Sequence, residues 1–238
     1  VLNSKAVEAV DHLKNNSKKI VFLSNAPRPS SKVINFLLKM NLDKKYLSNV
    51  MTSGEAAIDA INQNKFGKTF FHLGPPRDTS LFEKQKNNKT EIEKCDFILC
   101  TGLFDNHEDD LSYYKNFLKE HISKKLICTN PDLIVHRGTK EELCAGSVAE
   151  VFKSLGGDVV YFGKPYKEVY DLCLKKNEKT LVIGDNLNTD IKGAANMNYD
   201  SLLITNGIHK DEIKQNGIEV VLKNYSSKIN FLQSELKW

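Results

Sequence analysis

Two aspartates stand close together after an apolar segment near the carboxyl end of the chain. In the stretch LVIGDNLNTDIKGA, residues 181–194, Asp185 and Asp190 follow a short run that is typical of a buried strand. Two carboxylates in one turn repel each other unless a positive charge lies near both. A hard cation such as Mg²⁺, which carboxylates and phosphate oxygens bind together, meets that need. The simpler interpretation is that Asp185 bonds to backbone and that a neighbouring polar residue caps the next helix.

Two further segments place polar groups just after predicted strands. The segment VFLSN ends at Ser24 and Asn25, ahead of a predicted helix, and a hydroxyl beside a helix N-terminus favours an anion. A cap or a turn explains that segment equally well. In FGKPY, Lys164 precedes a proline that suits the first turn of a helix. Taken singly, a surface lysine is the simpler interpretation there.

Taken together, these residues suit one kind of chemistry. The carboxyl ends of parallel strands meet at one edge of a sheet, where α/β proteins bind their ligands. At such an edge the acidic pair would hold a cation, while Lys164 and Ser24 would neutralise and hold a phosphoryl group. These are the groups that phosphoryl transfer requires, except for the nucleophile.

The elements that must position these residues follow from the hydrophobic pattern. Helical stripes and short apolar runs alternate at both ends of the chain, which predicts a parallel sheet covered by helices. The predicted elements there are helices over 4–16, with Ser4 as cap, over 29–42, from 166 and from about 191, and strands over 19–25, 180–184 and 201–205. We predict an α/β fold with a doubly wound, parallel-sheet, Rossmann-like core formed by residues 1–53 and 161–238.

The middle third of the chain has a different pattern. Its predicted strands lie in 68–74, 95–102 and 124–138, separated by a polar stretch over 83–93 and a helix over 111–123. We predict that residues 54–160 form an α/β domain inserted into the core.

Composition narrows the classes of function. The chain has 238 residues, a formal net charge of +4 and 27% charged residues, and only three of its 34 basic residues are arginines. Nucleic-acid surfaces usually cluster arginine with aromatic residues, so no nucleic-acid partner is expected. No apolar run approaches the roughly 20 residues of a membrane helix. The five cysteines form no Cys-x-x-Cys pair, which favours reduced core residues in a cytoplasmic protein with no membrane partner.

The motifs resemble those of the haloacid dehalogenase-like (HAD) phosphohydrolases. More narrowly, they resemble subclass IIA, the nitrophenylphosphatase-like group, whose large α/β cap is inserted between the second and third motifs. FLSN is similar to the second motif, which implies that Ser24 and the backbone of Asn25 bind phosphate. GKP is similar to the third, which implies that Lys164 orients nucleophile and phosphate. GDNLNTD is similar to the fourth, which implies that Asp185 binds Mg²⁺ and that Asp190 supports it.

The resemblance extends to the inserted domain. TNPD, residues 129–132, and CAGSVAE, residues 144–150, resemble cap-side segments of the subclass. The polar candidates for contact with substrate are Asn130, Asp132 and His136. Asn-Pro-Asp is also ordinary turn chemistry, and His136 after an apolar run also fits an edge strand.

One motif of the family is absent from the sequence. The first motif, Asp-x-Asp-Gly, carries the nucleophilic aspartate and the general acid, and neither DHLKN nor DNHEDD matches it. In the family its strand lies in the middle of the sheet, where its loss would leave buried backbone groups unpaired. We therefore expect the natural polypeptide to begin roughly 20–30 residues upstream, with both carboxylates there.

The resemblance implies an Mg²⁺-dependent phosphomonoesterase that acts on a small phosphorylated metabolite through an aspartyl-phosphate. The alternative is a catalytically silent relative that binds a phosphorylated ligand or a protein partner. The intact Ser24, Lys164, Asp185 and Asp190 argue against that alternative. A dinucleotide-binding domain is disfavoured because no G-x-G-x-x-G follows a strand. The substrate stays open, as does a homo-oligomeric state, to which caps of this kind often contribute.

Overall fold

The chain divides into two compact units in a computed structural model that describes residues 2–137, 140–175 and 178–238. The first unit comprises Val1–Phe22, Ile34–Val50 and Lys164–Trp238, and the second comprises Leu23–Val33 and Met51–Gly163. The strands β1 (Phe22–Ser24) and β2 (Val50–Thr52) pair with each other where the chain passes from one unit to the other. The division into a core and an inserted cap stays a prediction, because compactness does not establish which unit acts as a cap.

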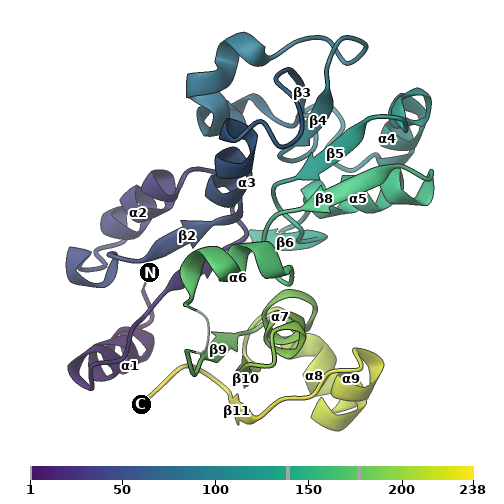
Figure 1. The fold of residues 1–238 in the computed structure, drawn as a ribbon. Helices are drawn as coiled ribbons and strands as arrows, with labels where there is room; N and C mark the ends of the chain where they lie inside the picture. Colours follow the sequence, from purple (N-terminus) through teal and green to yellow (C-terminus); the bar gives the residue numbers. More distant parts are fainter. Residues whose placement is uncertain (1, 138–139, 176–177) are drawn as a thin grey trace. The chain divides into compact units, whose positions relative to one another are not determined.

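A three-stranded parallel sheet organises the carboxyl-terminal part of the first unit (Figure 1). Its order is β11–β10–β9, and Leu202 at its centre lies opposite Ile183 on one side and Phe231 on the other. Leu187 and Leu203 belong to the buried cluster that packs against this sheet. The elements are β9 (Leu181–Gly184), a π-helical turn (Leu187–Ile191), α7 (Lys192–Asn196), β10 (Asp200–Ile204), α8 (Lys210–Asn216), α9 (Ile218–Asn224) and β11 (Phe231–Gln233).

A second hydrophobic cluster holds the amino-terminal part of the first unit. Leu42, Tyr46 and Leu47 are buried there, and Val7 and Val10 on the apolar stripe of the first helix pack against them. The elements of this part are α1 (Ser4–Asn15), α2 (Ser30–Lys39), which begins in the second unit, and a 3₁₀ turn (Lys44–Tyr46), while α6 (Lys167–Cys173) belongs to the carboxyl-terminal part of the first unit.

The predicted cap of α1 was wrong by one residue. Asn3, and not Ser4, precedes the helix with an extended backbone, and its side chain accepts hydrogen bonds from the N–H groups of Lys5 and Ala6. An N-cap residue needs this extended conformation to direct its oxygen at the first turn. Ser4 is already helical.

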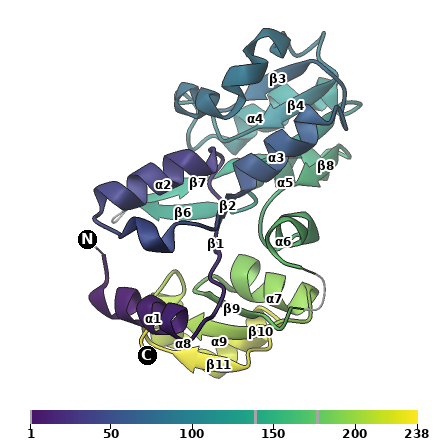
Figure 2. The same ribbon diagram turned by 60° about the vertical axis from the view of Figure 1, so that its left-hand side comes forward.

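The second unit contains a four-stranded parallel sheet, in the order β3–β4–β5–β8 (Figure 2). The inner strand β4 has the sequence FILC, and all four of its residues are buried, which explains the continuous apolar run. Helix α5 packs against β4, β5 and β8, and α3 contacts the 3₁₀ segment that follows β3. The elements are α3 (Ser53–Asn62), β3 (Phe70–Leu73), a 3₁₀ segment (Pro76–Asn88), β4 (Phe97–Cys100), α4 (Leu111–Leu118), a 3₁₀ turn (Lys119–His121), β5 (Lys125–Cys128), the antiparallel pair β6 (Ile134–Arg137) and β7 (Lys140–Leu143), α5 (Ala145–Ser154) and β8 (Asp158–Tyr161).

The predicted α/β class with parallel sheets is confirmed. The predicted strands over 68–74, 95–102, 180–184 and 201–205 correspond to β3, β4, β9 and β10. No helix or strand was predicted over residues 206–238, where α8, α9 and β11 lie. None of the five cysteines forms a disulfide, and four of them are buried. Within the described ranges, no helix has the length and apolarity to cross a membrane.

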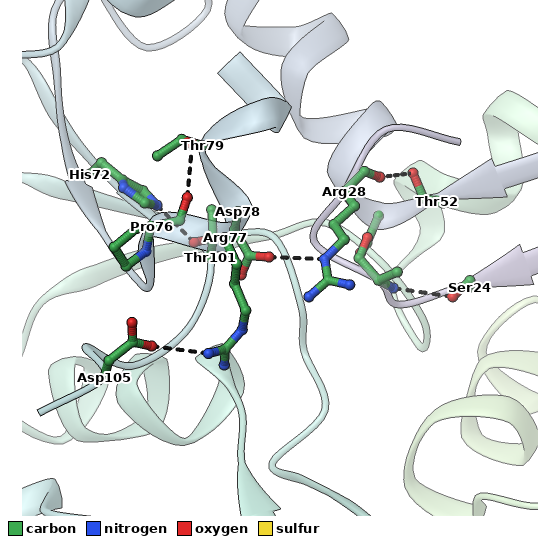
Figure 3. A network of polar contacts seen from close by, with 12 residues as sticks. Ser24, Arg28, Thr52, His72, Pro76, Arg77, Asp78, Thr79, Thr101 and Asp105 are labelled. Carbon is green, nitrogen blue, oxygen red and sulfur yellow. Dashed lines mark hydrogen bonds and ion pairs between the residues drawn. The ribbon is translucent and has the colours of Figure 1, made fainter. Parts of the chain in front are cut away.

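His72, near the end of β3, is a buried titratable group. Its Nε2 lies 2.8 Å from Thr101 Oγ1 (Figure 3). Its ring also meets that of Phe82 edge-on, with centroids 4.7 Å apart. Burial lowers the pKa of His72 from 6.5 to about 4, and the positive charge of Lys89 adds to this effect. The unfolded chain therefore binds the proton more readily than the folded protein does.

We predict that His72 makes the protein acid-sensitive. Because its folded pKa is depressed, the associated stability is present above pH 6.5 and is lost as pH falls toward 4. Between pH 7 and pH 5 the free energy of unfolding should fall by roughly 2 kcal/mol through this group. Urea unfolding of His72→Gln should show a flatter pH dependence, whereas His107→Gln should keep the wild-type slope. Equal slopes for the wild type and His72→Gln would contradict the assignment.

Candidate functional site

A buried ion pair joins two segments of the first unit. Lys164 Nζ donates to Asp190 Oδ1 at 2.6 Å, and the two side chains are 15% and 9% exposed. The second oxygen of Asp190 accepts a hydrogen bond from the Asn186 N–H at 3.2 Å. Lys164 lies just ahead of α6, and Asp190 lies in the π-helical turn after β9. Both carboxylate oxygens of Asp190 are therefore engaged by this chain.

Asp185 is placed differently from Asp190. It directly follows β9 and is half-buried, and its Oδ2 accepts a hydrogen bond from the Ile208 N–H at 3.0 Å. Within the part of the chain that the structure describes, its Oδ1 has no hydrogen-bond partner. One oxygen of Asp185 is held by backbone, and the other can accept an external ligand.

Two glycines make room for these carboxylates. A Cβ atom on Gly184 would lie 2.2 Å from the Asp190 carboxyl carbon, and one on Gly207 would lie 2.1 Å from Asp185 Oδ2. Any larger residue at either position would displace the carboxylate beside it. Sequence reasoning could have found Gly184, because it directly precedes Asp185, but no pattern in the sequence points to Gly207.

His209 holds the turn that carries Asp190. Its Nε2 accepts a hydrogen bond from the Leu187 N–H at 3.2 Å, and its Nδ1 lies 3.2 Å from Glu212 Oε2. These partners assign the ring proton to Nδ1. The ring is buried and also meets Tyr225. Sequence reasoning missed His209, because its partner Leu187 lies 22 positions away.

The second unit holds Ser24 and Asn25. Ser24 Oγ accepts a hydrogen bond from the Ala26 N–H at 3.2 Å (Figure 3), which leaves the hydroxyl hydrogen able to donate elsewhere. Asn25 is buried, and its side-chain amide donates to Asp132 Oδ1 at 3.0 Å. The backbone at the end of β1 is thus fixed by a carboxylate more than 100 positions away.

The three candidates for substrate contact have different surroundings. Asn130 is buried, and its Oδ1 accepts a hydrogen bond from the Asp132 N–H at 3.1 Å within its own turn. Asp132 is half-buried and holds Asn25. The backbone of His136 lies in β6, and its side chain lies outside the described residues. The roles predicted for all three in substrate recognition stay predictions.

The side chains available as ligands determine whether this chain could hold the predicted Mg²⁺. Among the described residues, no three His, Cys, Asp or Glu side chains gather closely enough to hold a metal ion. Mg²⁺ does not need such a cluster, because waters and phosphate oxygens commonly complete its shell around one or two carboxylates. The open oxygen of Asp185 fits a ligand of this kind, and Asp190, with both oxygens engaged, fits a supporting role.

The structure therefore brings the predicted residues together in two sets. Lys164, Asp185 and Asp190 lie in the first unit, where the ion pair joins two of them. Ser24 and Asn25 lie in the second unit. That both sets act on one ligand stays a prediction.

Two models of known protein families match this chain. The model described as haloacid dehalogenase-like hydrolase matches residues 2–86, and the model described as HAD-hydrolase-like matches residues 161–225. The first match includes Ser24 and Asn25, and the second includes Lys164, Asp185 and Asp190.

The similarity to individual relatives extends over most of the chain. An acid sugar phosphatase of Staphylococcus haemolyticus is 27% identical over 220 residues, which are 88% of this chain and 81% of the relative. A haloacid dehalogenase-like hydrolase from Brucella suis has a solved structure with a TM-score of 0.80 and 29% identity, covering 87% of this chain and 80% of its own. The structure of a 4-nitrophenylphosphatase from Thermotoga maritima has a TM-score of 0.73 and 26% identity, covering 99% and 88%.

We predict that breaking the buried ion pair from one side is costly. Lys164→Met leaves the Asp190 charge buried and unneutralised, which should lower the free energy of unfolding by roughly 3–5 kcal/mol. Lys164→Met combined with Asp190→Asn removes both charges and should recover most of that loss. Lys167→Met is the matched control, because Lys167 pairs with Asp171 at the surface and should change stability by roughly 0.5 kcal/mol or less. Urea unfolding at pH 7 measures all three, and equal losses for the two lysine variants would refute the prediction.

Proposed function

Because the chain belongs to the haloacid dehalogenase-like hydrolases, in their nitrophenylphosphatase-like subclass, we propose that it is an Mg²⁺-dependent phosphomonoesterase that acts on a small phosphorylated metabolite. The observation that carries the proposal is the arrangement of Lys164, Asp185 and Asp190, which leaves one carboxylate oxygen open beside a buried ion pair. The similarity to an acid sugar phosphatase makes sugar phosphates the first compounds to test.

The residues of this chain have distinct roles in the proposal. Ser24 donates its hydroxyl hydrogen to a phosphoryl oxygen, and the Asn25 N–H donates to another. Lys164, oriented by Asp190, supplies a positive charge that screens the phosphoryl group from an attacking carboxylate. Asp185 would hold Mg²⁺, which when bound neutralises charge on the phosphoryl oxygens.

The covalent step is assigned to the first motif of the family. In the chemistry of that motif, its aspartate attacks phosphorus, and the bond between phosphorus and the ester oxygen breaks. A second carboxylic acid gives its proton to the departing oxygen and then takes one from the water that hydrolyses the aspartyl-phosphate. In this proposal Ser24 keeps its hydrogen bond to a phosphoryl oxygen, and Lys164 keeps its charge, through both steps.

We predict that Asp185→Asn abolishes Mg²⁺-dependent activity without unfolding the protein. The full-length natural protein would be assayed for phosphate release from sugar phosphates, nucleotides, phosphoglycolate and pyridoxal phosphate. Turnover of the best substrate should fall roughly 10²-fold or more in Asp185→Asn, because the variant loses a charged metal ligand but keeps the bond from Ile208. Asp211→Asn, at an exposed position of α8, is the control and should behave as the wild type.

Two outcomes would count against the proposal. Wild-type turnover of Asp185→Asn at saturating Mg²⁺ would exclude Asp185 as the metal ligand. No hydrolysis of any compound by the wild-type protein would favour the catalytically silent relative.

A further inference from the structure

Arg28 lies four residues after Ser24, in the same segment of the second unit. Its Nε donates to Asp78 Oδ1 at 2.9 Å, and the side chains of Arg28 and Asp78 are 38% and 4% exposed. Figure 3 shows the two Nη atoms of Arg28 on the side of the guanidinium away from this bond. In the described ranges neither Nη atom has a hydrogen-bond partner. A buried carboxylate thus orients an exposed group of unused N–H donors.

The backbone around Arg28 is also held firmly. Thr52 Oγ1 donates to the Arg28 carbonyl oxygen at 2.6 Å, and Ser53 Oγ donates to the Ala26 carbonyl oxygen at 3.1 Å (Figure 3 shows the first of these). Thr52 is the N-cap of α3 and Ser53 is its first residue, and Glu55 in the same helix accepts from the Ser30 N–H at 2.9 Å. The backbone of the segment from Ala26 to Ser30, which directly follows Ser24 and Asn25, is therefore held at the start of one helix.

The spacing between Ser24 and Arg28 suits a small ligand. Four residues span at most about 14 Å even when fully extended, and the Ala26–Ser24 hydrogen bond turns this segment back on itself. A molecule whose phosphoryl group contacts Ser24, and whose remaining atoms extend along this segment, would come within reach of the Arg28 side chain.

The charge balance indicates which ligand atoms fit. The pair of Arg28 and Asp78 has no net charge, and the neighbouring pair of Arg77 and Asp105, joined at 3.0 Å, has none either. A ligand carboxylate would gain contact with Arg28 but would meet the charge of Asp78 behind it. Hydroxyl and carbonyl oxygens accept from the Nη atoms without that opposition.

We propose that Arg28 is a specificity-determining residue, which donates from its Nη atoms to neutral oxygen atoms of the leaving group. The favoured substrates are then phosphate esters of neutral polyhydroxylated molecules, such as sugars. Asp78 is a positioning residue that orients Arg28 and cancels its charge. This inference rests on the proposed function, because it requires Ser24 to bind the phosphoryl group.

The test compares substrates with and without acceptor atoms in the leaving group. For the full-length natural protein with Mg²⁺, kcat/KM would be measured on glucose 6-phosphate, ribose 5-phosphate and phenyl phosphate. Arg28→Met should lower the ratio of the better sugar phosphate to phenyl phosphate roughly 10–100-fold, the value of a hydrogen bond from a charged donor. Arg77→Met is the matched control, since its partner Asp105 is exposed, and should change the ratio less than about threefold.

Two further variants separate recognition from support of the fold. Arg28→Lys keeps the charge but loses the planar fork, so its ratio should lie between those of the wild type and Arg28→Met. Asp78→Asn leaves Arg28 with an uncancelled charge, and should raise kcat/KM for 2-phosphoglycolate relative to glucose 6-phosphate. A loss of structure alone would lower both values together. Thermal unfolding of each variant shows whether it is folded.

Several results would overturn the inference. One is a folded Arg28→Met variant whose ratio of kcat/KM on sugar phosphate to kcat/KM on phenyl phosphate is unchanged, as it is when kcat/KM falls equally on both substrates. Another is an Arg28→Met variant whose kcat/KM falls more on 2-phosphoglycolate than on the sugar phosphates. A wild-type protein that prefers phenyl phosphate to every sugar phosphate would overturn it as well. If the wild type hydrolyses nothing, the proposed function itself fails, which is a different outcome from hydrolysis that is indifferent to Arg28.

Discussion

The buried contact between Lys164 and Asp190 is the constraint on which the rest of the first unit's site depends. Removing two charges from water costs several kcal/mol for each ion, so such a pair persists only when its geometry is close and its remaining atoms are bonded. Asp190 meets both conditions, through Lys164 at 2.6 Å and the Asn186 N–H. The pair fixes the start of α6 against the turn after β9. Asp190 lies against Gly184, whose missing side chain leaves room for its carboxyl group, and Asp185, the next residue along the chain, is held by the Ile208 N–H.

In the second unit, too, carboxylates hold polar groups in place, but the partners are different. Asp78 and Asp132 are carboxylates that hold Arg28 and Asn25, respectively, in the segment that follows β1. In each case the carboxylate comes from a distant part of the chain and the group that it holds lies near Ser24. Acidic residues therefore orient polar groups here, and Asp185 differs from them in keeping an oxygen unused within the described chain.

The strands and the residues that could do chemistry were predicted from local sequence patterns. Such a pattern needs only a few neighbouring positions. The apolar run of β4 and the segment containing Asp185 and Asp190 are of this kind. The residues that position them depend on contacts between distant segments, which no local pattern encodes. Gly207 makes room for Asp185, and His209 binds the Leu187 N–H, only because the chain returns to the sheet after β10. The cap of α1 was missed for another reason, since Asn3 and Ser4 both suit an N-cap.

The grouping of residues 23–33 with the second unit changes how specificity can arise. Ser24 and Arg28 share one segment, and the start of α3 fixes its backbone through Thr52, Ser53 and Glu55. In our proposal, a phosphoryl contact and a leaving-group contact thus lie in one segment of a single compact unit. Under that proposal, selection among phosphate esters depends on which leaving groups place an acceptor atom near Arg28, whereas Lys164 has the role of a charge acting on the phosphoryl group that all of them have in common.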